Sequence, residues 1–197
     1  MAKWATESGE VGIKVAVIGQ PGSGKGSIVR QLANFHGQSA VRTGTVSEAE
    51  VIRTEFIWPD PLPDGPFVRV RVFALSGRPC HQAAEQLLLV DSDALVFVVD
   101  CDPSYIAESR DCLISLMANA KHVGLNWAET VTVMQYNRAE RYPQLKPHEL
   151  DAWLGIVNGK VARFITSSND GENLGVAVNE AVQKVISRLS AKLNKSE

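Results

Sequence analysis

Four apolar runs rich in β-branched residues recur along the chain, spaced as strands are when they alternate with helices. They occupy residues 13–18, 94–99, 131–134 and 161–165, and each is followed by turn-forming residues and then by apolar positions at helical spacing. Continuous apolar runs are typical of strands that are buried on both faces. The pattern therefore predicts an α/β fold with a mostly parallel central sheet and helices on both of its faces.

Two further segments alternate apolar with polar residues, as half-buried strands do. Residues 51–58 and 67–75 flank a proline-rich turn at 59–66. A connection this short predicts one antiparallel hairpin at the edge of the sheet. Phe56 and Trp58, next to the turn, are interpreted either as packing within this edge or as an exposed surface for a partner.

The end of the chain has a third pattern, in which apolar residues recur at helical spacing with polar residues between them. These apolar residues are Val178, Val182, Val185, Leu189 and Leu193. The pattern predicts an amphipathic helix that closes one face of the sheet, with a partner-binding helix as the alternative.

Composition adds limits to this picture. The chain has 197 residues, of which 45% are apolar and 21% are charged, and no linker or repeat divides it. Residues 1–197 are therefore expected to form a single domain. The formal net charge of −2, with Lys and Arg scattered along the chain, argues against a general nucleic-acid binder.

The chain also lacks the signals of a membrane protein. Its longest apolar stretch is far shorter than the roughly 20 residues that cross a bilayer, and it carries no lipidation motif, so we expect no direct membrane anchor. Three cysteines without a CxxC pair and a charged beginning of the chain favour a cytoplasmic protein.

A glycine-rich motif follows the first apolar run and precedes a helical pattern, which is the setting of a phosphate-binding P-loop. The motif Gly19-Gln-Pro-Gly-Ser-Gly-Lys fits GxxxxGK. In such a loop, backbone N–H groups surround phosphate oxygens and the lysine reaches the β- and γ-phosphates. The predicted phosphate ligands are Gly19, Gly22, Ser23, Gly24 and Lys25.

The next residue departs from the motif, because Gly26 stands where a Ser or Thr hydroxyl binds Mg²⁺. Ser27 is the nearest alternative hydroxyl, so we expect Gly26 and Ser27 to contact nucleotide at a weakened Mg²⁺ site. The sequence GxPGxGKG is also similar to that of adenylate kinases. The arginine-rich monophosphate site and the lid of that family are not recognisable downstream.

Together with the P-loop, four segments resemble, in order, the motifs of small Ras-like GTPases, and they are closest to the bacterial MglA-like branch. Residues 51–58 are similar to the RT-containing switch I strand, and 73–79 occupy the place of the TxPGQ switch II. Residues 95–100 resemble the FVxD strand, and 133–140 resemble the QYNKxD base-recognition motif. The resemblance covers nearly the whole chain and implies a Ras-like P-loop domain that binds GTP or GDP.

The chemistry of the last motif agrees with base recognition. Asn137 at a strand end can bind the purine edge and hold the P-loop, and the Glu140 carboxylate, in place of the usual Asp, can accept hydrogen bonds from guanine N1–H and N2–H. Ser167 and Ser168 resemble the loop that turns a backbone N–H toward guanine O6. Both stretches remain open to interpretation as ordinary turns.

The resemblance also implies roles in the switch regions. Arg53 and Arg78 are the candidate catalytic residues: Arg53 as an arginine finger within the same chain, Arg78 in place of the water-positioning Gln. Thr54 would bind Mg²⁺ and the γ-phosphate, and the Gly77 N–H would contact the γ-phosphate. Ala74 replaces the Asp that holds Mg²⁺ through water. Either arginine could instead be a solvated side chain.

We therefore expect a guanine-nucleotide-binding switch with slow GTP hydrolysis and nucleotide-dependent binding of protein partners. A pseudo-GTPase scaffold without turnover and, further off, a P-loop nucleotide kinase are the alternatives. Asp100 fits either a metal-binding Walker B residue or the cap of a loop. The resemblance implies an effector or a roadblock-fold activating partner and a role in cell polarity, and we expect a monomer.

Overall fold

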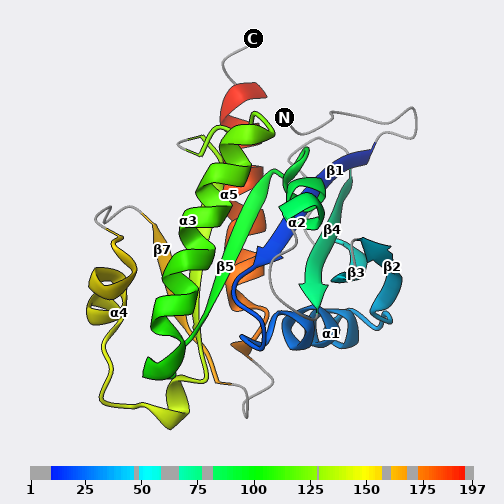
Figure 1. Cartoon of the computed structure of the whole chain (residues 1–197). Helices are drawn as coiled ribbons and strands as arrows, with labels where there is room; N and C mark the ends of the chain where they lie inside the picture. Colours follow the sequence, from blue (N-terminus) through cyan, green and yellow to red (C-terminus); the bar gives the residue numbers. More distant parts are fainter. Residues whose placement is uncertain are drawn as a thin grey trace.

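The computed structural model describes residues 10–46, 49–58, 67–76, 82–127, 129–156, 161–167 and 173–193 (Figure 1). Its strands are β1 (Glu10–Ile18), β2 (Val41–Val46), β3 (Ala49–Ile57), β4 (Phe67–Ser76), β5 (Ala94–Asp100), β6 (Val131–Asn137) and β7 (Ala162–Ile165). Its helices are α1 (Lys25–Phe35), α2 (Gln82–Leu89), α3 (Ile106–His122), α4 (Pro147–Leu154) and α5 (Val176–Leu193), with two short 3₁₀ turns, η1 (Pro103–Tyr105) and η2 (Ala139–Arg141).

The strands form one seven-stranded sheet in the order β2-β3-β4-β1-β5-β6-β7. β1 pairs in parallel with β4 and β5, and β6 pairs in parallel with β5 and β7. Among the described strands only β3 runs in the opposite direction to the others, since it is antiparallel to both β2 and β4. The predicted α/β fold with a mostly parallel sheet is confirmed.

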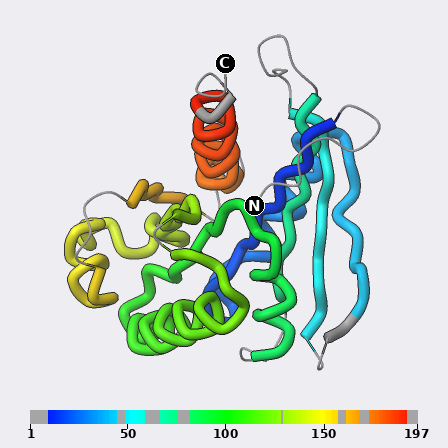
Figure 2. Tube along the Cα trace, turned by 90° about the horizontal axis from the view of Figure 1, so that it is seen from above, coloured from blue at the N-terminus to red at the C-terminus, as the bar shows by residue number. Residues whose placement is uncertain are grey.

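Helices cover both faces of the sheet. α1 and α5 pack on one face, where their apolar side chains meet Val15 and Val17 of β1. α2, α3 and α4 pack on the other face, against Ala16 and Ile18. Figure 2 shows α5 and α3 on opposite sides of the strands. β1 is thus buried on both faces at its carboxyl end, which explains its continuous apolar run.

The predicted C-terminal helix is confirmed as α5. Its residues Val178, Val182, Val185 and Leu189 are buried against the sheet, so this stripe packs in the core. None of the described helices combines the length and the apolar character needed to cross a membrane.

The predicted hairpin is confirmed as β3 and β4, but its expected place at the edge of the sheet is wrong. β2 lies outside β3, with a register shift between Arg42 and Gly44. Phe56 and Trp58 are buried, and the ring of Phe56 stacks on His36 after α1 with centroids 3.8 Å apart. These two aromatic residues therefore pack the edge of the sheet and do not form an exposed surface.

Candidate functional site

The glycine-rich loop joins the carboxyl end of β1 to the first turn of α1, and close contacts with two other strands define its path. Gly19 has φ +151°, and a Cβ there would overlap the carbonyl oxygen of Val98 on β5. Gly24 has φ +100°, and a Cβ there would overlap the side-chain nitrogen of Asn137 on β6. Glycine at both positions lets the loop lie directly against the ends of β5 and β6.

Two polar side chains of this loop are buried and lie on its inner side. Lys25 is only 7% exposed, and its Nζ donates to the carbonyl oxygens of Gly19, at 2.8 Å, and Gln20, at 2.6 Å. Ser23 is fully buried, and its Oγ has no hydrogen-bond partner within the described ranges. A buried hydroxyl without a partner is costly unless a ligand supplies one. The loop therefore fits a polyphosphate, which offers oxygen atoms to the N–H groups, to Ser23 and to Lys25.

Asn137, at the end of β6, connects the loop to the segment after β7. Its Nδ2 donates to the backbone oxygen of Ser23 at 2.8 Å, and its Oδ1 accepts from Thr166 Oγ1 at 3.2 Å. Thr166 is held in turn by its own N–H, which donates to the Tyr136 carbonyl at 2.8 Å, and by Gln135 Nε2 at 3.1 Å. The side chain predicted to read a base thus also braces the phosphate loop.

No family model matches the sequence, and no curated protein is significantly similar to it. The site is therefore interpreted from its own contacts. Thr166 is a part of it that the sequence motifs did not single out. The resemblance of residues 166–169 to a base-contacting loop concerned a backbone N–H, whereas it is the side-chain hydroxyl of Thr166 that binds Asn137.

The residues beyond Asn137 form a turn that carries the predicted carboxylate. Arg138 has a left-handed backbone with φ 61°, and its guanidinium forms an ion pair with Asp100 at the end of β5. Asp100 also accepts from the N–H of Asp102 at 3.0 Å. Asp100 is therefore the cap of a loop, the second of its two interpretations. Glu140 follows on η2 and is exposed, and Ser167 is half-buried after β7.

Three predicted site residues, Gly77, Arg78 and Ser168, lie outside the described residues. Arg53 is exposed on β3, where it pairs in register with Phe73 of β4. Side chains alternate along a strand, so Arg53 projects to the face opposite Ile52 and Thr54. Ile52 lies on the face of the sheet that α1 covers, so Arg53 projects to the other face and is not brought to the P-loop.

Few oxygen atoms lie at the expected Mg²⁺ position. Gly26 has no hydroxyl, and Ala74 is buried on the α1 face of β4 without an oxygen. Thr54 lies between Ile52, which faces Gly26, and Phe56, which stacks beyond the end of α1. It is 2% exposed with no partner for its Oγ1 within the described ranges. Thr54 thus packs beneath the middle of α1, and not beside the loop.

Ser27, the other predicted metal ligand, is exposed in the first turn of α1. Consecutive residues of a helix are about 100° apart around its axis, so the Ser27 side chain projects from a different side of α1 than a side chain at position 26 would. In the described part of the chain, no group of three or more His, Cys, Asp or Glu side chains could hold a metal ion. Within the described ranges, the groups that fit phosphate are therefore gathered in the loop, whereas Ser27 and Thr54 lie apart from one another.

A layer of buried polar residues lies between the P-loop and the helices α2 and α3. The Gln20 side chain is fully buried and accepts a hydrogen bond from Ser109 of α3. Glu85 of α2 is 1% exposed and accepts from Asn119 of α3. Burial raises the pKa of the Glu85 carboxyl, while Asn119 and the positive charge of Lys25 oppose that rise. The sequence motifs gave no sign of these contacts, which join residues far apart in the chain.

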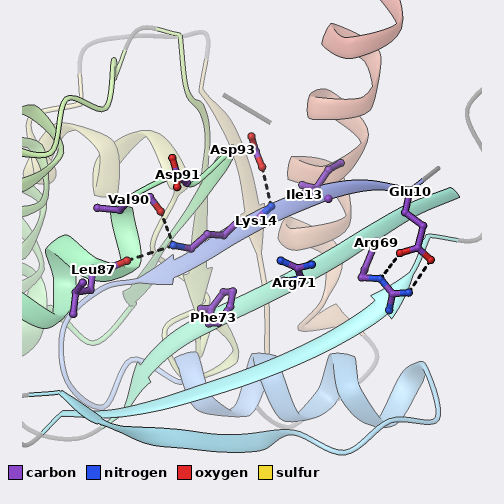
Figure 3. A pocket seen from close by; sticks show the side chains of 11 residues that line it. Glu10, Ile13, Lys14, Arg69, Arg71, Phe73, Leu87, Val90, Asp91 and Asp93 are labelled. Carbon is purple, nitrogen blue, oxygen red and sulfur yellow. Dashed lines mark hydrogen bonds and ion pairs between the residues drawn. The ribbon is translucent and has the colours of Figure 1, made fainter. Parts of the chain in front are cut away.

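A separate cavity of about 410 Å³ lies along β1 and β4, on the face of the sheet that α2 covers and beside the end of that helix (Figure 3). Lys14 crosses it, and its Nζ donates to the carbonyls of Leu87, at 3.3 Å, and Val90, at 2.6 Å. At its far end Arg69 binds both carboxylate oxygens of Glu10 at 2.8 Å. Lys14 and Arg69 are thus already bonded within the protein, and the cavity gives no indication of a ligand.

Proposed function

We propose that this protein binds a guanine nucleotide, with its phosphates in the loop of residues 19–25 and its base beside Asn137. The observation that carries the proposal is the hydrogen bond from the Asn137 side chain to the backbone of Ser23. This bond holds a side chain that can bind a purine edge directly against a loop that fits phosphate. The base and the phosphates of one nucleotide would contact these two parts of the site.

Guanine is favoured over adenine by the carboxylate that follows Asn137. Glu140 accepts hydrogen bonds but donates none when ionised, and guanine offers N1–H and N2–H where adenine has no such pair of donors. The half-buried Ser167 directly follows Thr166, whose hydroxyl binds Asn137. Both features support a guanine-specific pocket.

Two outcomes of binding remain distinct proposals. A switch would hydrolyse GTP slowly and change its surface for a protein partner. A pseudo-GTPase would hold nucleotide without turnover and act as a scaffold. Gly26 and Ala74 supply no metal-binding oxygen, and Arg53 projects to the face of the sheet opposite α1. Both features favour very slow GTP hydrolysis, because phosphoryl transfer depends on positioned charge.

Titration of the protein with GDP and with ADP tests the base assignment. We expect tighter binding of GDP, and Glu140→Asp should keep that preference because the shorter carboxylate has the usual geometry. Equal or tighter binding of ADP would contradict the guanine assignment. Transfer of phosphate to a nucleoside monophosphate would then support the kinase alternative.

Single-turnover hydrolysis of GTP separates the switch from the pseudo-GTPase. A measurable slow rate that falls in Arg53→Ala would support the switch and would require β3 to move on GTP binding. A measurable rate that is unchanged in Arg53→Ala would make this arginine a surface charge only. The absence of turnover, with nucleotide still bound, would support the scaffold.

A further inference from the structure

The side chain of Arg30 lies over Gly26, at the position where P-loop proteins carry a metal-binding hydroxyl. The two residues are one helical turn apart on α1, and side chains on a helix lean toward its N-terminus. If Gly26 carried a Cβ, that atom would be 3.3 Å from Arg30 Nη1 and 3.8 Å from Arg30 Cζ. The guanidinium therefore lies directly against the place that a side chain at position 26 would take.

The charge of Arg30 is not neutralised nearby. Arg30 is exposed, and within the described ranges no ion pair or hydrogen bond engages its guanidinium. α1 has the sequence KGSIVRQLANF and contains no acidic residue. The first turn therefore combines the positive end of the helix, the Lys25 ammonium and the Arg30 guanidinium.

A second observation indicates that this end of the helix is suited to bind an anion. Ser23 is fully buried in the adjoining loop, and its Oγ, without a partner within the described ranges, lies 3.3 Å from the place of a Cβ on Gly19. This hydroxyl is directed across the inside of the loop. A phosphate oxygen there would satisfy it and would lie at the same helix end that Arg30 covers.

We propose that Arg30 binds the nucleotide phosphates and supplies the positive charge that Mg²⁺ provides in other P-loop proteins. This inference rests on the proposed phosphate site. A guanidinium binds two phosphate oxygens at once and stays charged at every physiological pH, so it neutralises the β- and γ-phosphates without a metal. Nucleotide binding is then independent of Mg²⁺.

Gly26 and Arg30 form a matched pair in this arrangement. A side chain at position 26 would press on Arg30 Nη1 and on Ile52 Cδ1, both 3.3 Å from its Cβ. Ile52 is buried in the core and has little room to move, so the exposed arginine would be the one displaced. The absent hydroxyl is thus what gives the guanidinium access to the loop.

Binding of GDP is measured with EDTA and again with excess Mg²⁺, for the natural protein, Arg30→Gln and Arg30→Lys. The natural protein should bind with a Kd that differs less than about 10-fold between the two conditions. Arg30→Gln should weaken binding in EDTA about 10- to 100-fold, the usual effect of losing a charged hydrogen bond. Arg30→Lys, which keeps the charge and loses the paired donors, should fall between them.

Arg110→Gln is the matched control, because it removes one exposed arginine from α3 and leaves the net charge the same as in Arg30→Gln. Its Kd should equal that of the natural protein. Gly26→Ser gives a reciprocal test: it should weaken binding in EDTA by displacing Arg30 and make Mg²⁺ strengthen binding. A thermal melt of each variant verifies that it is folded.

Inorganic tripolyphosphate as a second probe separates this inference from the guanine assignment, since it has no base. Arg30→Gln should weaken its binding in EDTA by a similar factor, and Glu140→Asp should not. If GDP and ADP bound equally but tripolyphosphate still depended on Arg30, the guanine assignment would fail and the role of Arg30 would stand. If EDTA released GDP from the natural protein by orders of magnitude, or Arg30→Gln bound both probes normally, the role of Arg30 would be refuted.

Discussion

β1 has polar and charged groups near both of its ends, and the two sets differ in how fully they are bonded. At the amino end, Arg69 binds Glu10 and Glu55, and Glu55 also binds Arg71 at 3.2 Å. At the carboxyl end, Ser23 Oγ and Gln20 Nε2 are buried and have no partner within the described ranges.

This difference separates groups that hold the fold from groups that are open to a ligand. The chain of ion pairs at the amino end joins β1, β4 and β3, and it is complete without any other molecule. In the loop at the other end, Lys25 turns back onto the carbonyls of Gly19 and Gln20. A phosphate would replace those contacts with stronger hydrogen bonds between two oppositely charged groups.

The largest effect is expected from a substitution at the carboxyl end of β1. Lys25→Ala removes the charge that we propose binds the phosphates, and it should weaken GDP binding by about 100-fold. Arg69→Ala removes an equal charge at the amino end and should leave the Kd unchanged, with a small fall in melting temperature. Fluorescence titration and a thermal melt measure both quantities. Equal losses of affinity in the two variants would remove the distinction between the ends.

An intermediate effect is expected at the brace between loop and base pocket. Asn137→Ala leaves the Ser23 carbonyl without its donor and should reduce the free energy of unfolding by about 1–3 kcal/mol. It should also weaken the binding of GDP more than that of tripolyphosphate, because the proposed base contact is lost as well. Urea unfolding and titration check this, with the exposed Asn34→Ala on α1 as the control. Unchanged stability would mean that the hydrogen bond to Ser23 does not hold the loop.

The smallest expected effect compares one carboxyl group from each region by pH. Hydrogen bonds from Arg69 lower the pKa of Glu10, so its stabilisation exists above pH 4.5 and is lost as the pH falls through the lowered pKa. Burial raises the pKa of Glu85, so the folded state is favoured as the pH falls toward 4.5.

Urea unfolding of Glu85→Gln and Glu10→Gln at pH 7, at pH 4.5 and at a more acidic pH tests these opposite signs. Glu85→Gln should stabilise the protein at pH 7, and the gain should shrink at pH 4.5. Glu10→Gln should destabilise it slightly at pH 7, and most of this loss should remain at pH 4.5 and diminish only below it. A pH trend of the same sign in both variants would contradict the assignment of the two environments.

Local sequence was sufficient for the features that depend on neighbouring residues. The strands β1, β5 and β6 were predictable because each is a continuous apolar run followed by turn-forming residues. The P-loop was predictable because its glycine-rich motif directly follows β1. β2 was missed because it is short and polar, contains Gly44 and is irregular in register. The position of Thr54 also differs from expectation, because strand alternation buries its side chain under α1.

The rest of the site depends on contacts that no local pattern encodes. Ser109 binds a glutamine 89 positions earlier in the chain, and Asn119 binds a glutamate 34 positions earlier. The place of Arg30 follows from the absence of a side chain at Gly26, so it is visible only once α1 is built in three dimensions.

The irregularity of β2 bears on self-association. β2 is the outer strand of the sheet on that side, and an outer strand exposes backbone groups that another chain can pair with. The register shift between Arg42 and Gly44 interrupts the flat row of such groups, and the exposed Arg42 adds charge to it. A bulge and a charge on an outer strand are protections against edge-to-edge aggregation, so this part of the molecule can stay open without recruiting further copies.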